Sequence, residues 1–267
     1  MSVHSERWVH DSVPARLADA RARMPLLEAA PGQILFRFPT VGRVLVASGE
    51  PTRVELFPGG SHLDLDGFLR PTLGAAVAAV HGRFCLQGSA VELDGGAVIF
   101  AGLPLLVTSV MAACCATLGC RLLADRVIEI DRRTRSVAGC DEEIWLTPRL
   151  ARLVGLDRDR SEPIRRGAEL LRFRLPSTAG VVPVRHVYWL TRRGPGPSGQ
   201  AIGLSGSEKV ARLTRDCWHA GLLPALGLTV EVFRWAAGLG AGIAMSCATW
   251  DGGALPQLAA RLLEARA

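Results

Sequence analysis

The residues most able to do chemistry follow an apolar run at 98–101. Gly102 comes next, and Thr108 and Ser109 stand immediately before a stretch rich in Ala and Cys. A phosphate-binding loop has this layout, with the pattern Gly-x-x-x-x-Gly-Lys-(Ser/Thr) between a strand and a helix. Gly102 and Ser109 fit the pattern. Val107 stands in place of the second glycine, and Thr108 stands in place of the lysine.

Both replacements remove a contribution to phosphate binding. The loop lysine supplies the charge that holds the β- and γ-phosphates, and a threonine hydroxyl supplies none. A glycine lets backbone N–H groups approach a phosphate, whereas the β-branched Val107 resists a positive φ. We therefore predict that Gly102, Thr108 and Ser109 are the cofactor-binding positions of a degenerate loop, with no cofactor and no metal bound. Ser109 is expected to cap the following helix, with contact to Mg²⁺ as the alternative.

The first third of the chain predicts a small, mostly β unit. A helix is expected over 66–81, where apolar residues fall on one helical face and Gly82 follows. A short helix is also expected over 14–29. Short strands separated by turn residues are predicted at 34–38, 43–47 and 54–57. We assign residues 1–82 to a small β-rich N-terminal region with one helix.

From residue 83 onward, strand and helix patterns alternate, which predicts a layered α/β sheet. The predicted strands are 84–86, 90–93, 97–100, 121–125, 127–130, 181–190 and 243–247. The predicted helices are 109–118, 145–155, 207–217 with a continuation to about 240, and 256–267. Thr147-Pro148 favours a helix start, and so does Ser205 or Ser207 with Glu208 in the first turn. We assign residues 83–267 to one α/β domain.

The uncharged run from Gly95 to Cys120 is long enough to span a bilayer. Glycines and Pro104 divide it into a strand-like and a helix-like piece, so we favour a buried strand and a core helix and expect no membrane segment. The N-terminus carries charges and lacks the apolar core of a signal peptide. We therefore expect a cytoplasmic protein.

The chain contains seven cysteines, an odd number, with no Cys-x-x-Cys pair. This indicates reduced, buried thiols. A zinc or thiol site around Cys114, Cys115 and Cys120 is the alternative. Adjacent helical residues point about 100° apart and no histidine lies nearby, so the sequence does not favour this site.

The net charge is +6, and Lys209 is the only lysine among the basic residues. We attribute this preference for arginine to a GC-rich genome, which is a mutational cause. The functional alternative is an Arg-rich face for phosphate or an acidic peptide, because guanidinium binds oxyanions bidentately. Basic runs such as 132–135 and 165–166 are short and scattered, and the chain has a single tyrosine. We therefore expect no nucleic-acid partner.

Three motifs, taken in order, resemble one family. They are Arg-Phe-Cys-Leu-Gln-Gly-Ser-Ala-Val at 83–91, the strand and loop at 98–109, and Gly-Cys-Arg-Leu-Leu-Ala-Asp at 119–125. They resemble the kinase domain of HPr kinase/phosphorylase, and more closely the HPr kinase-related proteins of peptide-modification systems. Those proteins read L-H-G-S-A-V, F-x-G-x-S-G-x-G-K-S-T and L-L-A-D-D. The late strand, Asp251 and the final Leu/Ala-rich helix also fit, so the resemblance covers roughly residues 34–265.

The resemblance implies an α/β fold with a phosphate-loop type of sheet and flanking helices, preceded by the small β-rich region. It also implies a cleft whose kinase groups are largely replaced. The family's histidine is Gln87 here, and two loop glycines are Leu105 and Val107. The paired acids reduce to Asp125, which matches the first acid, followed by Arg126.

Asp125 is thus the one candidate catalytic residue, as a remnant base, and a strand-end residue paired with Arg126 or Arg121 is the equal alternative. Arg126 would either bind an acidic group in the cleft or form a solvated salt bridge. Phosphoryl transfer depends on positioning and charge neutralisation. Losing one such electrostatic group commonly raises the barrier by about 2.7–4 kcal/mol. Because several groups are replaced at this one site, ATP-dependent kinase activity is not expected.

These replacements lead to a functional hypothesis. The chain is predicted to be a catalytically degenerate HPr kinase-like protein, a pseudokinase, that binds a peptide or protein partner or serves assembly in peptide modification. The resemblance also implies a homo- or hetero-oligomer. The alternative is an enzyme with a repurposed cleft, with residual phosphotransfer or with Asp125, Ser109, Thr108 or Cys114 acting on a peptide or small molecule.

Overall fold

We analysed the fold in a computed structural model. It describes residues 8–139, 141–157, 159, 161–164, 167–192, 199–250 and 254–264, with the backbone alone for 62–64 and 66–71. Three positions named or counted in the sequence analysis lie outside these residues. They are Cys140, Arg165-Arg166 and Asp251.

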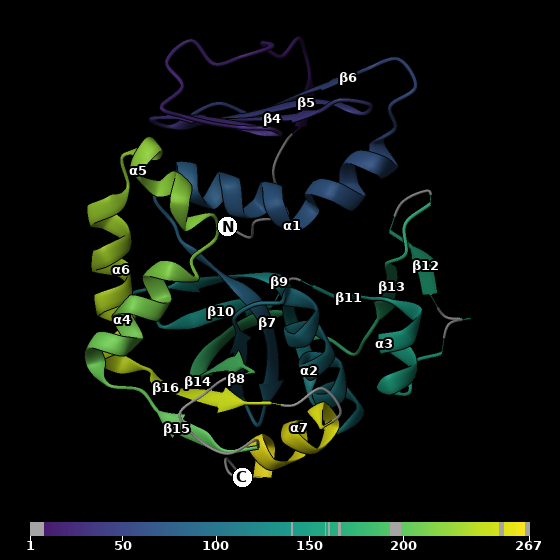
Figure 1. Cartoon of the computed structure of the whole chain (residues 1–267), viewed down its shortest axis with the longest axis vertical. Coiled ribbons are helices and arrows are strands. Elements are labelled where there is room, and N and C mark those ends of the chain that lie inside the picture. The colour runs from purple at the N-terminus through teal and green to yellow at the C-terminus, as the bar shows by residue number, and fades with distance from the viewer. Residues whose placement is uncertain are drawn as a thin grey trace.

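The N-terminal part of the chain forms a sheet of six strands above one long helix (Figure 1). The strand order is β1-β6-β5-β4-β3-β2, with β1 parallel to β6 and the other pairs antiparallel. Helix α1 (His62–Val80) lies between this sheet and the rest of the molecule. The strands are β1 (Trp8–His10), β2 (Ala22–Met24), β3 (Leu27–Ala30), β4 (Gln33–Phe38), β5 (Gly42–Ala47) and β6 (Thr52–Leu56).

The prediction of a helix over 14–29 is wrong. Residues of this segment form β2 and β3, an antiparallel hairpin with Pro25 and Leu26 at its turn. Pro25 would interrupt the hydrogen bonds of a helix at this point. Glu28 is 1% exposed in β3, and its carboxylate contacts Arg23 and Arg37 at 3.0 and 3.1 Å.

A second sheet has seven strands in the order β10-β9-β7-β8-β14-β16-β15. Its centre, β8, β14 and β16, is parallel, and β10 also pairs with the start of β14. The two patterns at 121–125 and 127–130 form one continuous strand, β9. The strands are β7 (Cys85–Leu93), β8 (Gly96–Ala101), β9 (Arg121–Asp131), β10 (Ser136–Gly139), β14 (Gly180–Thr191), β15 (Ala201–Gly203) and β16 (Ala244–Thr249).

Helices cover both faces of this sheet, because successive residues of β8 point to opposite sides. Val98 and Phe100 pack in a cluster with α2 (Leu105–Thr117) and α7 (Leu255–Glu264). Ile99 and Ala101 pack in a second cluster with α4 (Gly206–Arg215) and α6 (Thr229–Gly242). A short 3₁₀ turn (Ala220–Leu222) and α5 (Leu223–Leu226) contribute side chains to the core of the N-terminal sheet.

A small sheet flanks the start of α2. It contains β11 (Glu143–Leu146), β13 (Leu171–Arg174) and β12 (Ser161–Pro163), in the order β11-β13-β12. Helix α3 (Pro148–Leu153) follows β11, and the Thr147 side chain accepts from the Leu150 N–H. The predicted helix start at Thr147-Pro148 is confirmed, although the helix begins three residues later than the expected 145 because 143–146 pair as a strand.

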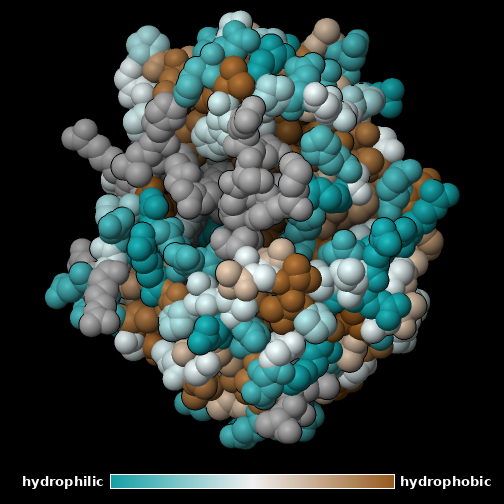
Figure 2. Space-filling view, turned by 180° about the vertical axis from the view of Figure 1, so that it is seen from behind, coloured by the Kyte–Doolittle hydropathy of each residue, from teal (hydrophilic) through white to brown (hydrophobic). Residues whose placement is uncertain are grey.

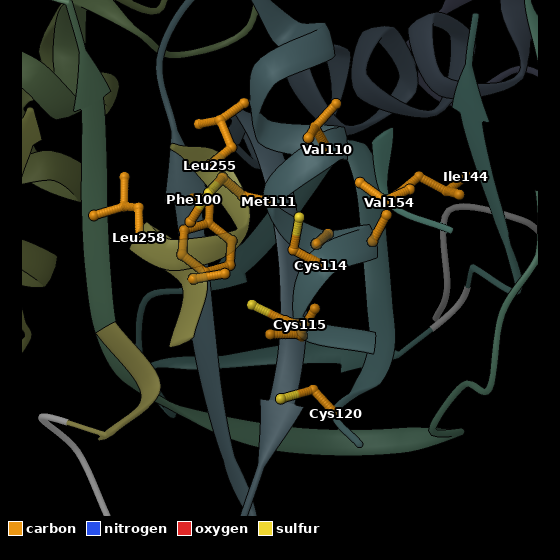
Figure 3. Packing of buried hydrophobic residues seen from close by; sticks show 14 of the residues in the cluster. Phe100, Val110, Met111, Cys114, Cys115, Cys120, Ile144, Val154, Leu255 and Leu258 are labelled. Carbon is orange, nitrogen blue, oxygen red and sulfur yellow. The ribbon is translucent and has the colours of Figure 1, made fainter. Parts of the chain in front are cut away.

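The apolar run at 95–120 is divided between β8 and α2, as the glycines and proline predicted. Figure 3 shows α2 surrounded by apolar side chains of its neighbours, including Phe100 of β8 and Leu255 and Leu258 of α7. The described helices include none that is both long and apolar enough to cross a membrane. On the face opposite to Figure 1, hydrophilic residues are interspersed with separate groups of hydrophobic ones (Figure 2).

Candidate functional site

Helix α2 begins at Leu105, four residues before the predicted start, with Pro104 as its N-cap residue. Ser109 therefore lies in the second turn, and the expectation that it caps the helix is wrong. A short connection, residues 102–104, joins β8 to α2. Gly102 has φ +112°, and an added Cβ would lie 3.1 Å from the Leu190 carbonyl oxygen, so a larger residue would strain this connection. Most of the expected phosphate loop is thus helical.

Three elements bring polar side chains together beneath the first turns of α2. Ser109 Oγ of α2 donates to Asp125 Oδ1 at 2.7 Å, and Ser89 Oγ of β7 donates to the same oxygen at 2.6 Å. Ser89 and Asp125 are directly paired in the β7–β9 ladder. The Trp145 backbone N–H donates to Asp125 Oδ2 at 3.3 Å. We refer to Ser89, Thr108, Ser109 and Asp125 as the Asp125 cluster; each is at most 4% exposed.

Thr108 occupies the lysine position of the loop pattern and points into this cluster. Its Oγ1 donates to the Leu105 carbonyl oxygen at 2.8 Å and lies 3.2 Å from Ser89 Oγ. Lys209, the single lysine, is engaged elsewhere, donating to the carbonyl oxygens of Gly240 and Ile243 at 3.3 and 2.9 Å. It therefore does not replace the missing loop lysine.

Burial controls the titration of Asp125. Desolvation raises the pKa of this carboxyl to about 6, against the lowering effect of the hydrogen bonds from Ser89 and Ser109 and of the Arg126 charge, while Asp141 raises it further. The Asp125 backbone N–H donates to Asp141 Oδ2 at 2.7 Å. Asp125 lies in the middle of β9 and not at a strand end. The site thus holds a carboxyl whose protonation changes near neutral pH, closed off from solvent.

Arg126 follows in β9 with φ +72°, a left-handed backbone conformation that is uncommon for a residue with a side chain. Its guanidinium carbon lies 5.1 Å from the centroid of the Trp145 ring, within cation–π range. One guanidinium nitrogen, Nη1, is buried and has no hydrogen-bond partner among the described residues. Among the described residues Arg126 forms no salt bridge, so the solvated salt bridge predicted for it does not occur there.

Gln87 lies in β7, where its neighbour Gly88 pairs with Arg126 of β9. The Gln87 backbone connects three segments. Its N–H donates to the Asp216 carbonyl oxygen at 3.2 Å, and its own carbonyl oxygen accepts from the Gly102 N–H at 3.4 Å. The structure thus gives Gln87 a backbone role beside the β8–α2 connection.

A pocket of about 610 Å³ lies at the start of α2. Sequence reasoning identified Arg126 in its lining and missed the contribution of Leu170, which precedes β13. An available signal was the run of apolar residues directly after Gly102, which a phosphate loop would not carry. We call this pocket the α2 pocket. Among the described residues, its lining is Leu103, Pro104, Leu105, Leu106, Arg126 and Leu170.

The thiols near α2 belong to the core. None of the six described cysteines forms a disulfide, and all six are buried; Figure 3 shows Cys114, Cys115 and Cys120 of the apolar cluster around α2. Burial raises the pKa of Cys114 to about 11, so this thiol is protonated at neutral pH. The described residues contain no group of three or more His, Cys, Asp or Glu arranged to hold a metal ion.

No family model matches the sequence, and a search of curated proteins finds no match. Among solved structures, the chain is similar to the HPr(Ser) kinase/phosphatase from Coxiella burnetii, with 12% sequence identity and a TM-score of 0.37. The alignment covers 68% of this chain and 88% of that one. A likeness of this degree carries no inference about the site or the activity. The predicted mixed α/β fold, with flanking helices and a small β-rich N-terminal region, is confirmed by the strands and helices described above.

Proposed function

We propose that this chain is a catalytically degenerate HPr kinase-like protein, a pseudokinase, that binds a peptide or protein instead of phosphorylating one. The assignment to peptide modification rests on the sequence resemblance to HPr kinase-related proteins. The loss of nucleotide chemistry rests on the site. The observation that carries the proposal is the closed Asp125 cluster, in which the hydroxyl and carboxylate groups at the loop positions bond to one another.

Each of these groups would have another partner in a working kinase site. A loop serine would contact Mg²⁺ and an acid would accept the proton of the attacking hydroxyl. Here Ser109 donates to Asp125, and Thr108 donates to the carbonyl of its own helix. To meet a nucleotide, Asp125 would have to leave a site where it accepts three hydrogen bonds. A phosphate would gain no lysine in return.

Isothermal titration with Mg-ATP tests this proposal. We expect no saturable heat up to millimolar nucleotide, because residues 102–109 lack the lysine and the second glycine of the loop pattern and residues 105–109 are helical. Binding in the micromolar range that is lost in a Ser109→Ala variant would overturn the proposal. A Ser207→Ala variant, altered on the exposed first turn of α4, is the matched serine control.

A repurposed enzyme is the second candidate, and the raised pKa of Asp125 favours it, since a general acid or base works best with a pKa near the working pH. Its requirement is a substrate path to a carboxyl that is 4% exposed. If an activity on a peptide or small molecule is found and the chain is such an enzyme, the Asp125→Asn variant should lose that activity. An unchanged activity in that variant would eliminate it.

The proposed assembly role is tested separately. Size-exclusion chromatography with light scattering measures whether the purified chain forms an oligomer, or forms one only with a partner protein. A monomer that stays unchanged with every candidate partner would contradict the assembly role and leave peptide binding as the proposal.

A further inference from the structure

The walls of the α2 pocket are apolar and reach solvent. Five of its six described lining residues are leucine or proline, and Leu103 is 67% exposed. The volume of about 610 Å³ falls within the range of about 300–1,000 Å³ that is typical of sites for small ligands. Exposed leucines at the mouth of a hollow are covered when an apolar group enters it. The walls therefore favour an aliphatic group in the ligand.

One cation stands among these walls. Arg126 is the only charged residue in the described lining, and its buried Nη1 has no hydrogen-bond partner there. A buried donor without a partner is unfavourable, and a carboxylate can satisfy a guanidinium with two parallel hydrogen bonds. The Arg126 backbone has φ +72°, a conformation in which glycine is favoured and a residue with a side chain is uncommon. The cation therefore favours an anionic group in the ligand, next to the aliphatic one.

The start of α2 supports the same charge. The helix has 13 residues, and its N-cap residue, Pro104, has no side-chain acceptor for the free N–H groups of the first turn. The Val107 N–H donates to the Pro104 carbonyl oxygen at 2.9 Å, which leaves the amides of Leu105 and Leu106 without an intrahelical partner. Both residues line the pocket. Such amides and the helix dipole favour a negative charge at this position.

We propose that the α2 pocket binds the carboxyl-terminal residue of a peptide that ends in a large aliphatic side chain. This inference rests on the proposed function and names the segment of the peptide that is recognised. In a terminal residue, the carboxylate and the side chain share one Cα, which matches a pocket where a single cation adjoins aliphatic walls. An internal Asp or Glu would also bring a second peptide unit against walls that offer it few polar partners.

Fluorescence anisotropy with labelled Gly-Ser-Gly-Ser-Leu-Leu tests the inference on the full chain. We expect saturable binding of the free-acid peptide, and at least a tenfold loss of affinity when the same peptide carries a C-terminal amide. Arg126→Gln should cause a similar loss. Arg126→Gly should also lose binding. Because glycine readily adopts φ +72°, this variant should stay folded, and its thermal unfolding checks that it does.

Arg192→Gln is the matched control. Arg192 also lies over an indole ring, 4.8 Å from the centroid of Trp250, but does not line the pocket. We expect its affinity to change less than twofold. Equal affinities for the acid and the amide, or full affinity in both Arg126 variants, would overturn the inference. Octanoate that binds the pocket when the peptide does not would also overturn it.

A parallel titration with Mg-ATP separates this inference from the proposed function. Loss of the proposed function would appear as micromolar nucleotide binding, whatever the peptide does. If only the inference fails, the protein does not bind nucleotide, and its affinity for the peptide is the same with the acid or the amide and in the wild type or the Arg126 variants.

Discussion

The Asp125 cluster and the α2 pocket both lie at the first turns of one helix, and they differ in nearly every physical respect. The cluster is polar, closed and internally hydrogen-bonded, with four residues at most 4% exposed. The pocket is apolar and open, and Arg126, the one cation in its described lining, has a nitrogen with no hydrogen-bond partner among the described residues. Under the proposed function, the hydroxyl and carboxyl groups of the cluster are structural, whereas the start of α2 offers a surface for binding. This contrast separates what the sequence motif suggests from what the folded site can do.

The largest expected effect on stability comes from a substitution in the Asp125 cluster. Asp125→Ala removes the acceptor of the Ser89 and Ser109 hydroxyls and of the Trp145 N–H, and leaves these donors buried. We expect a loss of about 3–5 kcal/mol in the free energy of unfolding, measured by urea denaturation at pH 5. Asp19→Ala, at an exposed aspartate, should change it by less than about 0.5 kcal/mol. Equal losses in the two variants would remove the structural role assigned to the cluster.

The pH dependence of the free energy of unfolding tests the Asp125 carboxyl without removing its side chain. Asp125 has a folded-state pKa of about 6 against an ordinary value of 3.8. Between these values the folded protein holds a proton that the unfolded chain has lost, so the contribution of Asp125 to stability falls as the pH rises from about 4 to about 6. The expected change is about 3 kcal/mol.

Comparison with Asp125→Asn isolates this contribution from other titrating groups. The unfolding free energy of the wild type should fall relative to that of the variant between pH 4 and pH 7, and the difference should then level off. Parallel curves over this interval would mean that Asp125 is not the raised carboxyl.

Within the cluster, Ser109 and Thr108 should differ. Ser109→Ala removes a hydrogen bond to a carboxylate, for which we expect a loss of about 1.5–3 kcal/mol at pH 7. Thr108→Val keeps the side-chain volume and removes a neutral hydrogen bond to the Leu105 carbonyl, for which about 0.5–1.5 kcal/mol is expected. Urea denaturation of both variants gives the order. A larger loss for Thr108→Val would show that the carboxylate is not the centre of the cluster.

The smallest effect on stability belongs to the pocket. Leu103 is 67% exposed, so Leu103→Ser should change the free energy of unfolding by less than about 0.5 kcal/mol. The same change should weaken binding of the free-acid peptide. Thermal unfolding and fluorescence anisotropy on one preparation check both. A clear loss of stability would mean that the pocket wall is core, and the contrast between the two regions would fail.

The elements that the sequence predicted best have local signals. Of the two predicted N-caps of α4, Ser205 is the one present. Its Oγ accepts from the Glu208 N–H, and the Glu208 carboxylate accepts from the Ser205 N–H, which completes a capping box. Strand β14 and helix α7 also follow from their apolar patterns. The prediction of a helix over 14–29 failed because it placed Pro25 inside the helix, whereas Pro25 and Leu26 form the turn between β2 and β3.

The candidate site depends on contacts that no local pattern contains. Ser89 meets Asp125 only through the register of β7 and β9, 36 residues apart in the chain, and Trp145 reaches the same carboxylate from the small flanking sheet. The motif comparison identified Asp125, Thr108 and Ser109 as positions of interest. It did not show that they would bond to one another, because side-chain pairing across strands is set by tertiary structure.

A crystal of the protein soaked with Mg²⁺ and a non-hydrolysable ATP analogue would show whether a nucleotide binds at the start of α2. We expect no nucleotide along residues 102–109, with Ser109 Oγ still within hydrogen-bond distance of Asp125 Oδ1. A triphosphate bound there, with Ser109 turned from Asp125 towards the metal ion, would contradict the proposed loss of nucleotide binding.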